Sequence, residues 1–217
     1  MPAPVAAPVA APVPAAVPAQ RSPGLDISGC YERSWNLLKG NFWTLFGVGA
    51  LTSAIFSALG YVQMLLPFIV TPILGAVLIA GVFYFLLLKI RGQPAGLADA
   101  FAGFTRSFLT LILVGIIVPI FLVVGLCCLV LPGLYLLVAY TFTPILAVDK
   151  GLGFWEAMET SRRTITRQWW QVLGLLLLGI PFLLLGLAAF GVGIFVAIPF
   201  VAAAVAYAYE DLCSQAK

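Results

Sequence analysis

The chain has no histidine and few charged residues. Eleven lysine and arginine residues and eight aspartate and glutamate residues occur among its 217 residues, whereas 63% of the residues are hydrophobic. Soluble domains carry about 25% charged residues, so this composition excludes an ordinary soluble protein. The net charge of +3 is small and gives no support to a nucleic-acid partner, because such partners select strongly basic surfaces.

Cysteine is also scarce, with four residues in the chain. Without histidine, a structural zinc site would need all four thiolates around one ion. Cys30 and Cys213 fall on one side of the membrane topology derived below, and Cys127 and Cys128 fall near the other. The sequence therefore predicts no metal and no cofactor. For the adjacent pair Cys127–Cys128, packing at a helix end and a redox role are both open interpretations.

Long apolar runs are what the chain has in abundance. About 20 apolar residues in a helix cross the ~30 Å hydrocarbon layer of a membrane. Pro72, Pro119, Pro144, Pro181 and Pro199 can kink the helices that contain them. We predict an all-α, polytopic membrane protein with six transmembrane helices. The expected spans are 42–63, 68–88, 108–130, 131–148, 170–190 and 193–209.

Three polar segments alternate with pairs of spans. They are 26–41, a stretch beginning near Leu97, and 149–170, and each repeats apolar residues at helical spacing. We expect three interfacial amphipathic helices, the first of them capped by Asp26 or Ser28. In the third, Glu159 and Arg163 are spaced for an ion pair. Its opposite face carries Phe154, Met158, Ser161, Ile165 and Trp169.

The charges predict the orientation. With six spans, both termini and the connections after the second and fourth spans share one face, and all eleven basic residues fall on that face. The positive-inside rule places this face in the cytoplasm, together with both termini. The five tryptophans fall on the same face, as an interfacial belt would. They are Trp35, Trp43, Trp155, Trp169 and Trp170.

The chain divides into a disordered Pro/Ala-rich tail (1–24), a six-helix membrane domain (25–212) and a short C-terminal tail (213–217). An offset of 127 residues pairs Glu32 with Glu159 and Ser34 with Ser161. The same offset pairs Trp43 with Trp170. We interpret this as a possible three-fold internal repeat, with units of about 26–90, 97–149 and 153–212. Chance similarity between apolar sequences is the alternative.

The spans contain no ionisable residue at depth, which argues against a proton pump or a channel lined by charges. Without histidine, only carboxylates could act as acid or base, and each is better interpreted as a helix cap, an ion-pair partner or a solvated end. These carboxylates are Asp99, Asp149, Glu156, Glu159, Glu210 and Asp211. We therefore predict that the protein is not an enzyme. Asp149 and Glu156 are the first residues to test if it is one.

Lipid is the remaining functional signal. Arg162, Arg163 and Arg167 are suited to anionic headgroups, and the five tryptophans suit the headgroup region. Simple membrane anchoring is the alternative. The leading hypothesis is a non-enzymatic protein that organises lipids or membrane-protein partners, including other copies of itself, at the cytoplasmic face. The other is a transporter or permease component for a weakly polar or lipidic solute.

The run from Leu131-Pro132-Gly133 through YLLVAYTFTPILAVDKGLGFWEAMETSRR resembles a signature of YciC-like bacterial integral membrane proteins of unknown function. These proteins are related to the membrane domain of some glycerophosphodiester phosphodiesterases. The resemblance covers roughly 26–210 and implies six helices in the bacterial cytoplasmic membrane. It implies no catalysis, because the phosphodiesterase domain has no counterpart in these residues. The matching positions are Pro132, Gly133, Pro144, Asp149, Ala157 and Ser161.

Overall fold

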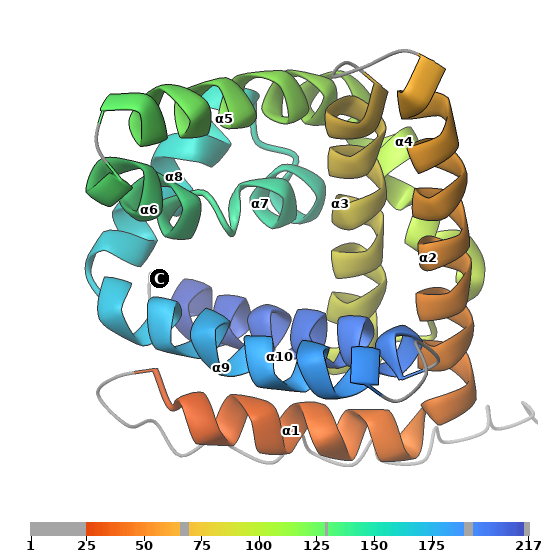
Figure 1. Cartoon of the computed structure of the whole chain (residues 1–217). Coiled ribbons are helices and arrows are strands. Elements are labelled where there is room, and N and C mark those ends of the chain that lie inside the picture. Colours follow the sequence, from red (N-terminus) through yellow and green to blue (C-terminus); the bar gives the residue numbers. More distant parts are fainter. Residues whose placement is uncertain (1–24, 66–69, 129, 189–192, 215–217) are drawn as a thin grey trace, which may run out of the picture.

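A computed structural model describes residues 25–65, 70–128, 130–188 and 193–214. The tail 1–24, the turns predicted near Leu66-Pro67 and Gly191, and the last three residues lie outside the described part. The described part is helical, with short connections (Figure 1). Its elements are α1 (Ile27–Gly40), α2 (Phe42–Leu65), α3 (Val70–Ile90), the 3₁₀ helix η1 (Leu97–Phe101), α4 (Ala102–Arg106), α5 (Phe108–Cys128), α6 (Val130–Ala139), α7 (Thr143–Lys150), α8 (Phe154–Thr166), α9 (Trp169–Ala188) and α10 (Ile194–Ser214).

The prediction of six spans is confirmed in the part of the chain that the structure describes. Six helical stretches there are long and apolar enough to cross a membrane. Asp26 is the N-cap of α1, as predicted, and its carboxylate accepts a hydrogen bond from the backbone N–H of Gly29 at 3.0 Å. The segment 149–170 is not one helix, because Gly151 adopts a left-handed conformation (φ 65°) that ends α7 before α8 begins.

The three hairpins have an inner and an outer helix. The second spans, formed by α3, α6–α7 and α10, have 56%, 50% and 50% of their residues buried, whereas each first span (α2, α5 and α9) has 22% buried. In Figure 1 the hairpins α5–α6, α2–α3 and α9–α10 form the upper, right-hand and lower sides of the molecule, with α7 inside them. The outer helices therefore present their apolar side chains to the surroundings.

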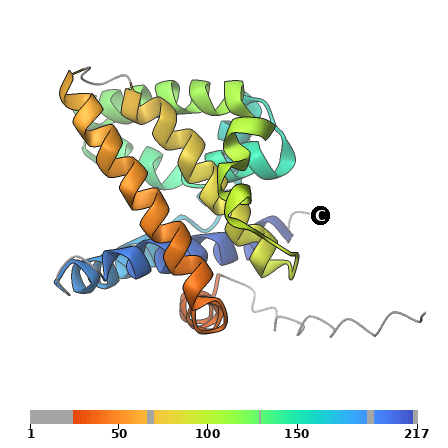
Figure 2. The same ribbon diagram turned by 90° about the vertical axis from the view of Figure 1, so that its right-hand side faces the viewer.

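The short helices join neighbouring hairpins. α1 packs on α10, η1 and α4 pack on α3, and α8 packs on α7. Each short helix thus covers the inner helix of the hairpin that precedes it, and α1 covers the inner helix of the last hairpin, which closes the ring. Figure 2 shows α1 end-on beneath α9 and α10. This arrangement ties the N-terminal element of the described chain to its C-terminal helix.

Two glycines let η1 and α4 lie directly on the backbone of α3. A Cβ on Gly81 would lie 1.9 Å from the carbonyl oxygen of Ala100, and a Cβ on Gly103 would lie 2.2 Å from that of Val77. Both distances are far below van der Waals contact, so only glycine permits this approach. Gly81 and Val77 lie in the middle of α3, which means that the second amphipathic segment reaches well along the spanning helix.

The buried side chains of the three outer helices lie near the starts of these helices. Among the described side chains, α2 buries Leu45 and Val48, α5 buries Leu111 and Val114, and α9 buries Val172 and Leu175, all near the start of their helices. Lipid tails are as apolar as these side chains, so close van der Waals packing holds them together. The hairpins are therefore held together mainly at one end, the end that carries the charged residues.

Candidate functional site

The ends of the three inner helices meet in one charge cluster, which consists of Arg91, Asp149, Tyr209 and Glu210. Arg91, the residue after α3, binds both carboxylate oxygens of Asp149 at 2.6 and 2.9 Å through Nη1 and Nη2. Its Nε donates to Glu210 at 2.7 Å. The hydroxyl of Tyr209 donates to Asp149 at 2.9 Å. Every hydrogen-bonding edge of the guanidinium therefore has a carboxylate partner, and α3, α7 and α10 are connected.

A second ion pair lies one residue further along α10. Arg33 of α1 donates to Asp211 at 3.0 Å through Nη1, and its guanidinium lies 4.9 Å from the centre of the Tyr207 ring. Hydrogen bonding to Asp211 raises the pKa of Arg33. The adjacent Cys30 thiol is buried, and burial raises its pKa to about 12. This thiol is therefore protonated at neutral pH and is not a nucleophile.

The fourth span is broken where Pro144 follows Thr143. Proline has no N–H to donate and disfavours helical geometry in the residue before it. The N–H of Thr143 turns to the carbonyl of Tyr140 at 3.1 Å, which leaves the Ala139 carbonyl outside the helical ladder. Ser161 of α8 donates its hydroxyl to that carbonyl at 2.6 Å. Two positions of the sequence signature, Pro144 and Ser161, therefore act on the same break.

The other signature positions lie elsewhere. Gly133 packs on α5, where a Cβ would lie 2.9 Å from the backbone nitrogen of Leu126, and the neighbouring Pro132 belongs to the first turn of α6. Ala157 is fully buried on α8, and Asp149 belongs to the charge cluster. The six positions are thus distributed over a helix turn, a helix break, a packing contact and an ion pair, and they do not form one pocket.

The predicted arginine surface lies on α8 and the connection to α9. Glu159 accepts hydrogen bonds from Arg162 at 2.8 Å and from Arg163 at 2.5 Å, which confirms the predicted pair. The two arginines lower the pKa of Glu159 to about 2, so the carboxylate is ionised at neutral pH. The segment 159–167 contains three arginines and only this one carboxylate, so its net charge is positive. The Arg163 side chain is 75% exposed.

The five tryptophans differ in their exposure and in what they contact. Trp155 and Trp170 are 63% and 78% exposed at the two ends of the α8 segment, and Trp43 is 81% exposed on α2. Trp35 packs edge-on against Phe200 and is still 49% exposed, whereas Trp169 is partly buried on the ring of Tyr135, with a centroid distance of 6.5 Å. Trp170 thus follows the arginine segment at the start of α9, whereas Trp35 and Trp43 lie on α1 and α2.

The carboxylates singled out in the sequence have structural partners in several cases. Asp99 accepts a hydrogen bond from the backbone N–H of Gly96 at 2.8 Å and caps η1. Asp149 and Glu210 share Arg91, and Asp211 binds Arg33. Within the described residues, no three histidine, cysteine, aspartate or glutamate side chains lie close enough to hold a metal ion.

Sequence reasoning missed Arg91 and Tyr209 as members of the charge cluster. A signal for the cluster was present, because a charged residue lies at or just beyond the end of the second span of each hairpin: Arg91, Asp149 and Glu210. Opposite charges at equivalent ends of three inner helices predict an ion-pair network, once it is known which helices are inner.

An all-helical, multi-pass membrane protein is the class that this fold and these charged helix ends define. Comparison with known protein families, with curated proteins and with solved structures finds no match for the chain.

Proposed function

We propose that this is a non-enzymatic membrane protein that binds anionic lipid headgroups through the surface formed by α8 and the start of α9. The observation that supports it most is the excess of positive charge on the exposed face of the segment 159–167, which is followed by the exposed Trp170. Basic residues near an anionic leaflet attract it, and tryptophan rings prefer the headgroup region. The proposed role of the protein is therefore to organise lipids.

The ion pairs within α8 support binding of a lipid headgroup, beyond a general attraction between positive charge and the membrane. Glu159 holds Arg162 and Arg163 side by side, which orders two guanidinium groups that would otherwise be flexible. Planar guanidinium groups bind phosphate oxygens through two parallel hydrogen bonds. A single glutamate cannot neutralise both arginines, so the pair keeps a positive charge for a headgroup. The same contacts leave Arg167 outside the pair and next to the aromatic residues of α9.

The proposal includes the cytoplasmic orientation of this surface, because the positive-inside rule places the basic residues there. It also includes a bacterial cytoplasmic membrane and membership of the YciC-like proteins, on the signature from Pro132 to Ser161. We further propose that the three helix–hairpin units are copies of one repeat. The recurring packing of the short helices on inner helices supports this, as does the burial of both Ser34 and Ser161.

Replacing Arg163 and Arg167 with glutamine is expected to weaken binding of anionic lipid by about thirtyfold, since each basic residue near such a surface contributes about 1 kcal/mol. The measurement is the ratio of phosphatidylglycerol to phosphatidylcholine retained by the purified protein from mixed nanodiscs, read by mass spectrometry. Lys89→Gln with Lys150→Gln removes the same charge elsewhere on the charged side and should preserve the ratio. An equal loss of lipid selectivity in both variants would mean that net charge alone attracts the lipid, and it would contradict a site on α8.

The transporter alternative has one observation of its own. An open groove of about 520 Å³ lies between the first two hairpins, beside the break in the fourth span, and is lined by residues that include Gly75, Pro119 and Tyr140. Saturable flux of a lipidic tracer in proteoliposomes, lost when Gly75 is replaced with leucine to fill the groove, would favour this function. Flux equal to that of protein-free liposomes would contradict the transporter function.

A further inference from the structure

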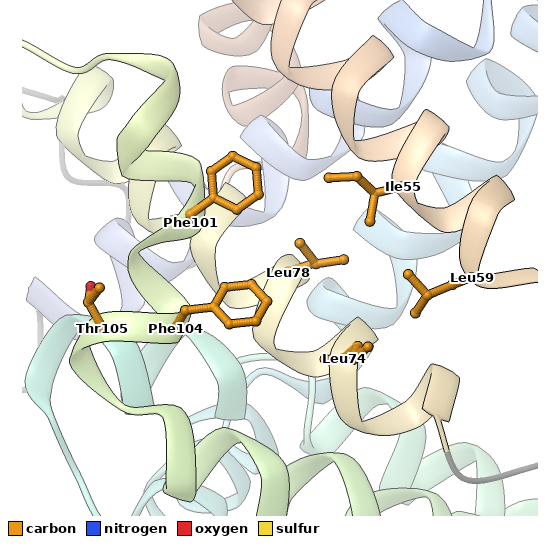
Figure 3. A pocket seen from close by; sticks show the side chains of 7 residues that line it. All are labelled: Ile55, Leu59, Leu74, Leu78, Phe101, Phe104 and Thr105. Carbon is orange, nitrogen blue, oxygen red and sulfur yellow. The ribbon is translucent and has the colours of Figure 1, made fainter. Parts of the chain in front are cut away.

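We propose that a second groove, between the first hairpin and η1–α4, binds one acyl chain of a phospholipid from the surrounding membrane. The groove has a volume of about 390 Å³ and opens to the surroundings. Figure 3 shows Phe101 and Phe104 on one side, facing Leu74 and Leu78 of α3 and Ile55 and Leu59 of α2. Three walls, formed by α2, by α3 and by η1 with α4, therefore border one apolar space in the size range of ligand sites, roughly 300–1,000 Å³.

The lining leaves nothing for a polar ligand to bind. Six of the seven lining residues are hydrocarbon side chains, and the seventh is Thr105. The hydroxyl of Thr105 donates to the Ala102 carbonyl of its own helix at 3.2 Å, and Figure 3 shows it directed away from the groove. A polar solute would lose its hydrogen bonds to water here and gain none in exchange. The groove is thus selective for hydrocarbon.

The groove lies on spanning helices, so the hydrocarbon that can enter it comes from the surrounding lipid. Ile55 and Leu59 belong to the candidate span Phe42–Tyr61, and Leu74 and Leu78 belong to Ile73–Ile90. An open groove at these positions meets lipid tails and not water, because the bilayer core excludes water. A lipid chain is linear and can lie along the hairpin, in contact with both α2 and α3.

The short elements η1 and α4 form the third wall, although neither is long enough to span a membrane. They nevertheless expose large apolar side chains, with Leu97 at 49%, Phe101 at 36% and Phe104 at 38% of their surface. Phe104 lies between the rings of Phe101 and Phe108, at centroid distances of 6.4 and 5.9 Å, which fixes its orientation over the groove. An exposed, ordered aromatic row beside spanning helices is suited to contact with a chain.

This inference extends the proposed function to a second, chain-dependent lipid contact, and it is separable from the arginine surface because no charged residue lines the groove. The test uses phosphatidylglycerol and phosphatidylcholine that carry a diazirine near the end of one acyl chain. After irradiation in nanodiscs, labelled peptides are mapped by mass spectrometry. We expect the label to concentrate on Phe101, Phe104 and Leu74 with both headgroups.

The comparison sites are Leu177 and Leu184 of α9, which are 54% and 60% exposed and lie outside the groove. Filling the groove with Ile55→Phe and Leu74→Phe should lower its labelling to the level of these two sites. The pair Leu177→Phe and Leu184→Phe, made as the control, should leave the groove labelled. Thermal unfolding of each variant checks that it folds.

Three results would overturn the groove as a chain site. The first is wild-type labelling that follows exposure alone, equal in the groove and on α9, which is contact with bulk lipid. The second is groove labelling with phosphatidylglycerol only, which would mean that the headgroup holds the lipid. The third is a groove protected from lipid by another copy of the chain, seen as no groove label in dimers. The variant in which Arg163 and Arg167 are replaced with glutamine should lose headgroup selectivity and keep the groove labelling. The two proposals can therefore fail independently of each other.

Discussion

Gly81→Ala lowers the free energy of unfolding by about 2–3 kcal/mol, the expected cost of inserting a methyl group into a well-packed contact. The added Cβ would lie 1.9 Å from the carbonyl oxygen of Ala100, so η1 and α3 must separate. Because α4 also rests on α3, the separation would extend to Gly103 and Val77. Chemical denaturation in detergent micelles, followed by tryptophan fluorescence, measures the change.

Gly60→Ala is the matched control, because Gly60 lies in helix α2 and a Cβ there would meet no atom within 4 Å. Alanine is favoured over glycine inside helices, so this variant should keep the stability of the wild type or gain up to about 1 kcal/mol. Equal stability of both variants would show that η1 does not rest on α3 as described. Such a result would also remove one wall of the acyl-chain groove.

Arg91→Gln is expected to lower the free energy of unfolding by about 2 kcal/mol. Removing one partner of a buried pair costs about 3–5 kcal/mol, and solvent screening reduces this where a partner is partly exposed. The Arg91 side chain is 36% exposed, but that of Asp149 is 9% exposed and would keep its charge with Tyr209 as its remaining neutral partner. The same denaturation experiment gives the value.

Lys89→Gln is the control for Arg91→Gln, since it removes the same charge two residues away and has no ion-pair partner within the described residues. It should change stability by less than about 0.5 kcal/mol. A double-mutant cycle with Asp149→Asn isolates the contact, and the two effects should be less than additive by about 1 kcal/mol or more. Additive effects would mean that Arg91 and Asp149 do not interact.

The features that could be predicted from sequence are those encoded by neighbouring residues. Apolar runs give the six spans, Asp26 gives the start of α1, and the four-residue spacing of Glu159 and Arg163 gives their ion pair. Each depends on helix geometry within one segment. The sides of the membrane are also inferred from local properties, the connection lengths and the charges, and they stay a prediction.

The features that could not be predicted depend on which helices are inner. Arg91 and Glu210 are 119 residues apart and meet only because α3 and α10 both lie inside the ring. Pro144 is recognisable as a possible kink, but the identity of the freed carbonyl and its partner Ser161 requires the position of α8 on α6 and α7. Hydrophobic patterns are nearly uniform around such helices and do not distinguish an inner face.

The tryptophans show the limit of compositional reasoning in another way. An interfacial belt is inferred from where tryptophans fall along the topology, and it is a reasonable inference for Trp43, Trp155 and Trp170, which are exposed. Trp35 packs on Phe200 and is nevertheless 49% exposed, whereas Trp169 is partly buried and packs on Tyr135. The partner of Trp169 lies on α6, and the sequence alone does not place it there.

Sidedness decides whether the arginine surface can meet the anionic cytoplasmic leaflet. The most direct measurement is labelling of a single cysteine at Gln93, an exposed residue in the connection between α3 and η1, in a variant without the native cysteines. A membrane-impermeant maleimide should label this cysteine in inverted membrane vesicles and not in intact spheroplasts. Labelling from the outside of spheroplasts would place the charged helix ends and α8 on the opposite side and contradict the proposed lipid-binding role.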